Sequence, residues 1–165
     1  MNENLINHRK TVIDLILPYA IRNEKIILLV CDMGFGVTDN FKKKLPNRIF
    51  NVGIMEQGIV GIAAGMAMTG LIPIVYSIVN FLVFRALEQI RNDVIKQNLN
   101  VKFIGTGANN YFKFLGYSHC CGEDDKKIMK LINMRVFDPY EKVEIDFNKM
   151  LKGWITDKSA GYLRV

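Results

Sequence analysis

Short apolar runs alternate along this chain with longer stretches whose apolar positions recur at helical spacing. The short runs are nearly continuous in Ile, Val and Leu, which is typical of strands covered on both faces. Strands are predicted at residues 26–31, 48–52, 72–76, 101–106, 134–137 and 160–165. Helices are predicted at residues 3–22, 39–45, 53–70, 81–97, 123–132 and 143–151.

This alternation predicts a single α/β domain over residues 1–165, a three-layer α/β/α fold with a mostly parallel six-stranded sheet. Right-handed crossovers place the carboxyl ends of parallel strands at one edge of the sheet, where ligand sites of such folds lie. We therefore expect four loops to meet there, namely residues 32–36, 53–56, 76–81 and 107–119.

Composition narrows the function classes. A chain of 165 residues with 50% apolar content has room for one core. The net charge is +6, but the basic residues are scattered, and we interpret the densest run, Lys42–Lys44, as a solvated helix end. A nucleic-acid-binding module is therefore the weakest alternative. The apolar runs are too short to cross a bilayer and the start has no signal-peptide pattern, so we expect a cytoplasmic protein.

Two segments carry the candidate chemistry. Residues 51–57 read Asn-Val-Gly-Ile-Met-Glu-Gln, followed by Gly-Ile-Ala-Ala-Gly-Met-Ala at residues 61–67. Residues 85–93 read Arg-Ala-Leu-Glu-Gln-Ile-Arg-Asn-Asp. In this order and spacing the segments resemble the pyrimidine-binding domain of the transketolase family, and the resemblance covers roughly residues 26–140. It implies a thiamine-diphosphate-dependent enzyme that transfers a two-carbon ketol unit between sugars.

The resemblance assigns the central role to Glu56. It implies that the Glu56 carboxyl group lies beside a ring nitrogen of the cofactor's aminopyrimidine and shares a proton with it, which activates the cofactor. The alternative is an acidic residue that merely opens a helix, where acidic side chains are common.

Further cofactor contacts follow from the same resemblance. Phe81 falls at the position that stacks on the aminopyrimidine, and Phe84 falls near a second aromatic position. Asp32 and Ile54 are also expected at the cofactor. Core packing is the alternative for both phenylalanines, and the stronger one for Phe84. For Asp32 the alternative is a turn-forming aspartate.

The loop before the fifth strand is expected to face the substrate. Residues 117–120 read Tyr-Ser-His-Cys and resemble a family segment whose histidine contacts the substrate, which makes His119 a second candidate catalytic residue. The loop lacks the acidic-glycine stretch that transketolases usually carry here. Asn109, Asn110 and Tyr111 are candidates for hydrogen bonds to sugar hydroxyls instead.

A second departure concerns the diphosphate. The family binds the cofactor's diphosphate and Mg²⁺ through a separate domain with a Gly-Asp-Gly…Asn motif, and no Gly-Asp-Gly occurs here. We therefore expect a stand-alone subunit, matching the C-terminal section of a split enzyme, that is inactive without a diphosphate-binding partner. An α2β2 assembly is the expected arrangement. Two alternatives remain open: the small subunit of a two-subunit 2-oxo acid decarboxylase, and a non-catalytic scaffold subunit.

Overall fold

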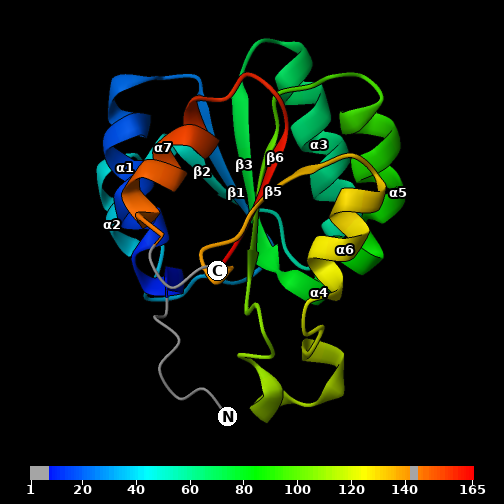
Figure 1. Cartoon of the computed structure of the whole chain (residues 1–165). Helices are drawn as coiled ribbons and strands as arrows, with labels where there is room; N and C mark the ends of the chain where they lie inside the picture. Colours follow the sequence, from blue (N-terminus) through cyan, green and yellow to red (C-terminus); the bar gives the residue numbers. More distant parts are fainter. Residues whose placement is uncertain (1–7, 142–144) are drawn as a thin grey trace.

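The computed structural model describes residues 8–141 and 145–165, which form three layers with the sheet in the middle (Figure 1). Within these residues the strands form one six-stranded parallel sheet in the order β2-β1-β3-β4-β6-β5. The strands are β1 (Ile26–Val30), β2 (Ile49–Asn51), β3 (Ile72–Ile78), β4 (Lys102–Thr106), β5 (Arg135–Phe137) and β6 (Gly161–Arg164). The predicted fold class is confirmed.

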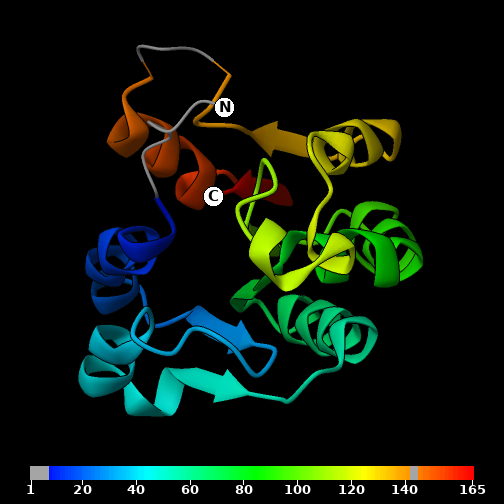
Figure 2. The same cartoon turned by 90° about the horizontal axis from the view of Figure 1, so that it is seen from below.

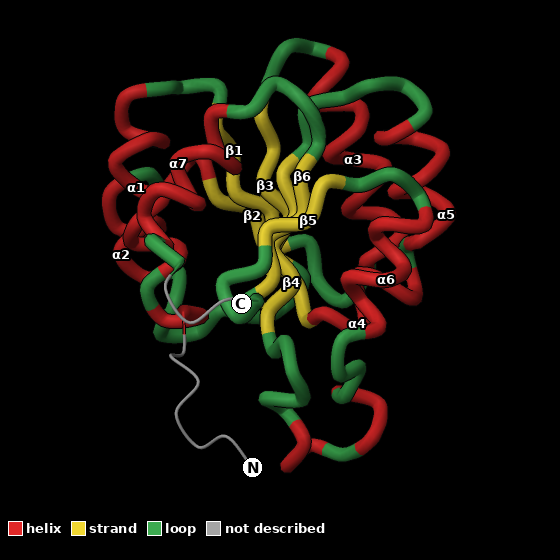
Figure 3. Tube along the Cα trace, in the orientation of Figure 1, coloured by secondary structure: helices red, strands yellow, loops and turns green. Residues whose placement is uncertain are grey.

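Helices cover both faces of the sheet (Figures 2 and 3). One face carries α1 (Val12–Arg22), α2 (Asp39–Lys44) and α7 (Phe147–Thr156). The other carries α3 (Glu56–Met68), α4 (Val79–Arg85), α5 (Leu87–Gln89) and α6 (Asp124–Leu131). None of the helices in the described ranges combines the length and the apolar content that crossing a bilayer requires.

The central strand β1 shows why the sheet needs two helical layers. All five of its residues are buried. Ile27 and Leu29 point into the core under α3 and α4, whereas Ile26, Leu28 and Val30 point into the core under α1, α2 and α7. Successive side chains of a strand face opposite sides, so an all-apolar run is stable only between two layers.

The predicted helix at residues 81–97 is wrong as a single helix. The helix begins earlier, at Val79, and its regular turns stop at Ala86, whose backbone lies at φ −110°, ψ 17°. α5 follows and passes into a π-helical segment, η3 (Ile90–Ile95). Apolar residues on both sides of the break are buried in the same core, so the hydrophobic pattern continues across it and does not reveal it.

Two other helix predictions have wrong ends. α7 begins at Phe147 because Asp146 caps it, its side chain accepting a hydrogen bond from the Lys149 N–H at 3.0 Å. It continues to Thr156 because Trp154 and Ile155 still pack into the core. Residues 143 and 144 of the predicted helix lie outside the described residues. Residues 3–7 of the first predicted helix also lie outside the described residues. A 3₁₀ turn, η1 (His8–Lys10), precedes α1.

A buried lysine lies at the opposite end of the sheet from the expected site. Lys102, the first residue of β4, is fully buried, and its ammonium group donates to the backbone carbonyls of Asp157 at 2.8 Å and Ser159 at 2.5 Å. Burial lowers the pKa of Lys102 to about 8, Asp157 partly opposes this, and Arg135 adds to it.

This lysine should make stability rise with pH. Between about pH 8 and pH 10 the folded state has released the Lys102 proton while the unfolded chain still holds it, so the unfolded state binds more protons. The free energy of unfolding, relative to that of Lys102→Met, should therefore increase by up to about 1.4 kcal/mol per pH unit. Urea titrations of both proteins from pH 7 to 10 measure this difference, in which other titrating groups cancel. A difference that does not change with pH would contradict the prediction.

Candidate functional site

The turn between β2 and α3 is fixed by the Asn51 side chain. Its carbonyl oxygen accepts hydrogen bonds from the N–H groups of Asp32 at 2.9 Å and Gly53 at 3.0 Å. Its amide donates to the Asp32 carboxylate at 3.2 Å. Gly53 has φ +80°, a left-handed conformation that glycine adopts without strain. The chain therefore reverses tightly, and α3 begins at Glu56.

Glu56 is a buried carboxylate at this edge. It is 4% exposed and lies in the first turn of α3, where the helix dipole favours a negative charge. One carboxylate oxygen accepts a hydrogen bond from Ser77 Oγ at 3.4 Å, and the other pairs with Arg85 Nη1 at 3.2 Å. Glu56 is therefore more than a residue that opens a helix, because side chains from β3 and α4 converge on it.

Arg85 links Glu56 to Phe81. Its guanidinium carbon lies 3.8 Å from the centre of the Phe81 ring, while one of its nitrogens pairs with Glu56. The Arg85 side chain is 47% exposed, so it covers the two groups from the solvent side. Arg85 opens the family-like segment at residues 85–93, but the sequence alone predicted no role for its side chain.

His119 joins the same group of residues. It lies in the 3₁₀ turn η5 (Tyr117–His119), and its ring makes an edge contact with Phe81, with ring centres 4.8 Å apart and planes at 69°. Three predicted site residues from three separate segments, Glu56, Phe81 and His119, are thus brought together. Phe81 is the central member, because Arg85 and His119 both contact its ring.

The other predicted residues lie around this centre. Ile54, on the turn before Glu56, is 73% exposed, and Phe84, on α4, is 49% exposed. Such exposure does not fit the core-packing alternative for Phe84. Asp32 is exposed and hydrogen-bonded to Asn51, and its backbone has φ +43°. It therefore stabilises the turn, which agrees with the alternative of a turn-forming aspartate.

Two buried thiols flank the site. Burial raises the pKa of Cys31, and the nearby Glu56 carboxylate adds to this, although hydrogen bonds from the Met55 backbone and Ser77 oppose it. Burial also raises the pKa of Cys121 to about 12. Both thiols therefore stay protonated at neutral pH, which makes them poor nucleophiles.

The asparagine side chains of the loop that carries His119 form hydrogen bonds within the protein. Asn109 and Asn110 have φ values of 54° and 63°, in the left-handed region that asparagine tolerates. The Asn109 side-chain oxygen accepts from Arg164 at 3.0 Å, and that of Asn110 accepts from the Gly122 N–H at 2.7 Å. A cavity of about 560 Å³ remains inside the loop, with Asn110 and Tyr117 among its lining residues.

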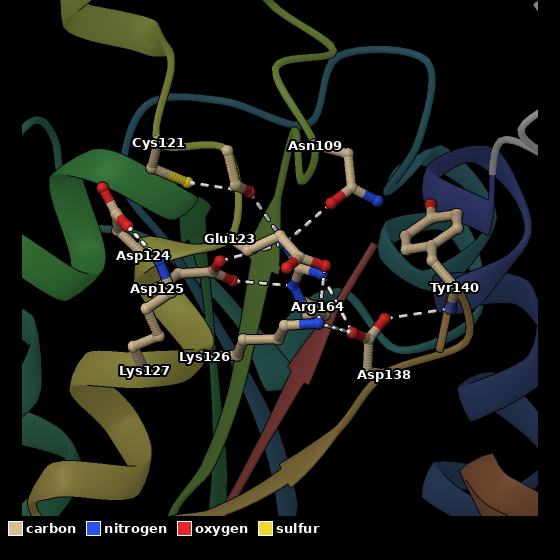
Figure 4. Close-up of polar contacts among 11 residues, drawn as sticks. Asn109, Cys121, Glu123, Asp124, Asp125, Lys126, Lys127, Asp138, Tyr140 and Arg164 are labelled. Atoms are coloured by element: carbon tan, nitrogen blue, oxygen red, sulfur yellow. Dashed lines mark hydrogen bonds and ion pairs between the residues drawn. The ribbon is translucent and has the colours of Figure 1, made fainter. Parts of the chain in front are cut away.

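A buried ionic cluster holds the base of this loop (Figure 4). Arg164 of β6 is fully buried and pairs with Asp125 at 2.8 Å and with Asp138 at 3.0 Å. The same guanidinium donates to Asn109 at the start of the loop and to the Gly122 carbonyl at its end, each at 3.0 Å. Arg164 therefore joins the two ends of the loop to the core of the domain.

The described residues also bear on metal binding. Across residues 8–141 and 145–165, no group of three or more His, Cys, Asp and Glu side chains is arranged to hold a metal ion. The acidic residues of the ionic cluster are instead paired with Arg164 and Lys126.

Comparison with known proteins identifies the family. Residues 6–159 match the family model described as "Transketolase, pyrimidine binding domain". The chain belongs to this family. The six-stranded parallel sheet is therefore that of a transketolase-type pyrimidine-binding domain.

Several relatives of this pyrimidine-binding domain are named as parts of transketolases. The 6-deoxy-6-sulfo-D-fructose transketolase subunit SqwH of Clostridium sp. (strain MSTE9) is 30% identical over 138 residues, 83% of this chain and 43% of that protein. An apulose-4-phosphate transketolase subunit from Phocaeicola vulgatus is 30% identical over 166 residues, 100% of this chain and 53% of that protein. The chain spans about half the length of these curated relatives.

Solved structures agree with the family. A chain described as "Split gene transketolase, inactive beta4 tetramer" superposes with a TM-score of 0.80 at 30% identity, over 98% of this chain and 51% of that one. The transketolase from Leishmania mexicana gives a TM-score of 0.76 over 99% of this chain and 26% of that one, at 16% identity, and shows the fold alone.

Proposed function

We propose that this chain is the pyrimidine-binding subunit of a two-subunit, thiamine-diphosphate-dependent transketolase that transfers a two-carbon ketol unit between sugars. One observation carries the proposal. The Arg85 guanidinium, a planar group with N–H donors, lies on the ring of Phe81 and bonds to the buried Glu56 carboxylate. Glu56 and Phe81 thus contact the same planar group with N–H donors, one by a hydrogen bond and the other by stacking. An aminopyrimidine ring is also planar and needs the same two kinds of contact.

Each residue then has a defined task. Glu56 would hold a proton beside the ring nitrogen of a bound aminopyrimidine, and its burial keeps water from competing for that hydrogen bond. Phe81 supplies the flat apolar surface against which the ring stacks. Arg85, whose side chain is half exposed, turns toward solvent to make room. The bound cofactor supplies the carbon–carbon bond chemistry, which the protein only orients and protects.

His119 is proposed to face the sugar. Its ring touches Phe81 from the side of the loop, so a substrate that reaches the cofactor next to Phe81 also reaches His119. Imidazole nitrogens both donate and accept hydrogen bonds, which suits sugar hydroxyl and carbonyl oxygens.

The same edge of the domain is proposed to contact a partner chain. Four large apolar side chains lie exposed on its loops: Phe35 at 81%, Ile54 at 73%, Phe114 at 75% and Tyr117 at 93%. Apolar surface of this kind typically marks an interface. The solved neighbour described as an inactive β4 tetramer of a split-gene transketolase supports the need for another subunit. We propose a cytoplasmic α2β2 enzyme whose partner binds the diphosphate and Mg²⁺.

Native mass spectrometry of the protein purified from its source cells tests the proposal. We expect the chain to be recovered with a second protein that carries a Gly-Asp-Gly…Asn motif, and with thiamine diphosphate bound to the complex. The complex would then be screened with ketose donors and aldose acceptors. Recovery of the chain without such a partner, and without cofactor binding after thiamine diphosphate and Mg²⁺ are added, would refute it.

A further inference from the structure

The side-chain amide of Asn80 holds the backbone on both sides of His119. Its nitrogen donates two hydrogen bonds, one to the Ser118 carbonyl at 2.9 Å and one to the Cys120 carbonyl at 3.0 Å. Asn80 precedes Phe81 in α4, whereas His119 lies about forty residues further along the chain. One side chain therefore ties the helix that carries Phe81 to the turn that carries His119.

Chemistry fixes the orientation of this amide. Both backbone groups are carbonyls, which accept hydrogen bonds and do not donate them, so the Asn80 nitrogen must face them. The Asn80 side-chain oxygen is then buried, and it has no hydrogen-bond partner within the described part of the chain. Leaving an acceptor unsatisfied costs on the order of 1–3 kcal/mol, so this orientation of the amide carries a stability cost.

The His119 side chain and backbone are held by contacts on several sides. Its backbone N–H donates to the Gly116 carbonyl at 3.1 Å, and its Nδ1 is hydrogen-bonded to Ser118 Oγ at 3.0 Å. The Phe81 ring lies against its imidazole. The ring can keep this position only while the turn stays close to α4, and the Asn80 amide provides the hydrogen bonds that join them.

We propose that Asn80 is a positioning residue that sets the His119 imidazole against Phe81 and thereby aligns the substrate-facing histidine with the cofactor-stacking ring. The consequence for catalysis rests on the proposed function, but the effect on His119 does not. Asn80 itself is not expected to contact cofactor or substrate, because both of its donor hydrogens are used on backbone carbonyls and its side-chain oxygen is buried.

Histidine NMR tests the proposal on the isolated chain, since it contains only two histidines. The chain is labelled on histidine, and the His8→Gln variant assigns the His119 ring signals. Phe81→Leu then shows where these signals move when the neighbouring ring is lost. We expect Asn80→Asp, which replaces the donor with an oxygen, and Asn80→Ala to move the His119 signals in the same direction.

Two controls separate positioning from general damage. The His8 ring stacks on Phe147 at 4.0 Å, so unchanged His8 signals report an intact fold. Asn92→Asp adds the same charge at an exposed site and should leave the His119 signals unchanged. His119 signals that keep their wild-type positions in Asn80→Ala would overturn the proposal, whether or not Asn80→Asp folds.

Kinetics of the assembled enzyme test the catalytic consequence. In both Asn80 variants we expect the dissociation constant of thiamine diphosphate to be unchanged and kcat/KM for the sugar to fall on the order of 10²-fold, as for a misplaced catalytic group. Equal weakening of cofactor binding and turnover would contradict a positioning role. If the wild-type complex binds no cofactor at all, the proposed function fails, whereas the NMR result still decides the role of Asn80.

Discussion

Replacing Glu56 by glutamine is expected to abolish nearly all ketol transfer by the assembled enzyme while the subunits stay together. Glutamine has nearly the same shape. Its one amide oxygen can still accept the hydrogen bond from Arg85, and its NH2 group can donate to the Ser77 hydroxyl, so the local fold should persist. It cannot exchange a proton with the aminopyrimidine. Loss of a positioned proton-transfer group typically costs about 10²–10⁴-fold in rate.

The rate at which the bound cofactor exchanges its C2 proton for deuterium measures this effect before any sugar binds. We expect this rate to fall with kcat in Glu56→Gln, and native mass spectrometry should show the same assembly as wild type. Glu88→Gln is the matched control, since Glu88 lies exposed in α5. Wild-type exchange and turnover in Glu56→Gln would refute the assigned role and favour the scaffold alternative.

The sheet could be predicted from the sequence because its signal is local. An all-apolar run such as residues 26–30 fits a strand with helices on both faces, and the regular order of strands and helices fixes the parallel arrangement. The location of the site followed from the same rule, since carboxyl ends of parallel strands share an edge. The helix break at Ala86 could not be predicted in this way, because buried apolar residues continue at helical spacing on both sides of it.

The polar contacts of the site could not be predicted in this way. Arg85 and Glu56 are 29 residues apart, Asn80 and Cys120 are 40 apart, and Arg164 and Asp125 are 39 apart. Each pair depends on which elements the folded sheet places side by side, which no local pattern records. The family motif indicated Glu56, but nothing in the motif distinguishes Arg85 from a solvent-exposed arginine. In the sequence, Arg164 is an ordinary residue of the last predicted strand.

Arg164→Met should destabilise the domain more than the loss of an ordinary ion pair. The side chains of Arg164 and Asp125 are 0% exposed and that of Asp138 is 4% exposed. Although burial opposes its charge, Asp125 and Asp138 raise the pKa of Arg164 above its ordinary value, so the guanidinium stays charged. Its removal leaves a buried carboxylate without a cation, which typically costs about 3–5 kcal/mol. Urea unfolding measures the loss.

Arg135→Met provides the matched control. Arg135 pairs with Asp157 at 2.6 Å, but its side chain is 64% exposed, and such pairs contribute about 0–1 kcal/mol. The Arg164→Met, Asp125→Asn double variant should recover part of the loss, because the unpaired buried charge is gone and Tyr162 can still donate to the amide oxygen. Equal losses in Arg164→Met and Arg135→Met would contradict the assignment.

The Arg164→Met variant distinguishes the two sets of hydrogen bonds that hold the His119 loop. Arg164 holds the ends of the loop, through Asn109 and Gly122, whereas Asn80 holds the turn around His119. Arg164→Met should therefore increase hydrogen exchange at the loop ends while the His119 ring signals keep their positions as long as the fold persists. If hydrogen exchange increases at the loop ends and the His119 ring signals also shift, the loop moves as one rigid unit. In that case Arg164, rather than Asn80, sets the position of His119.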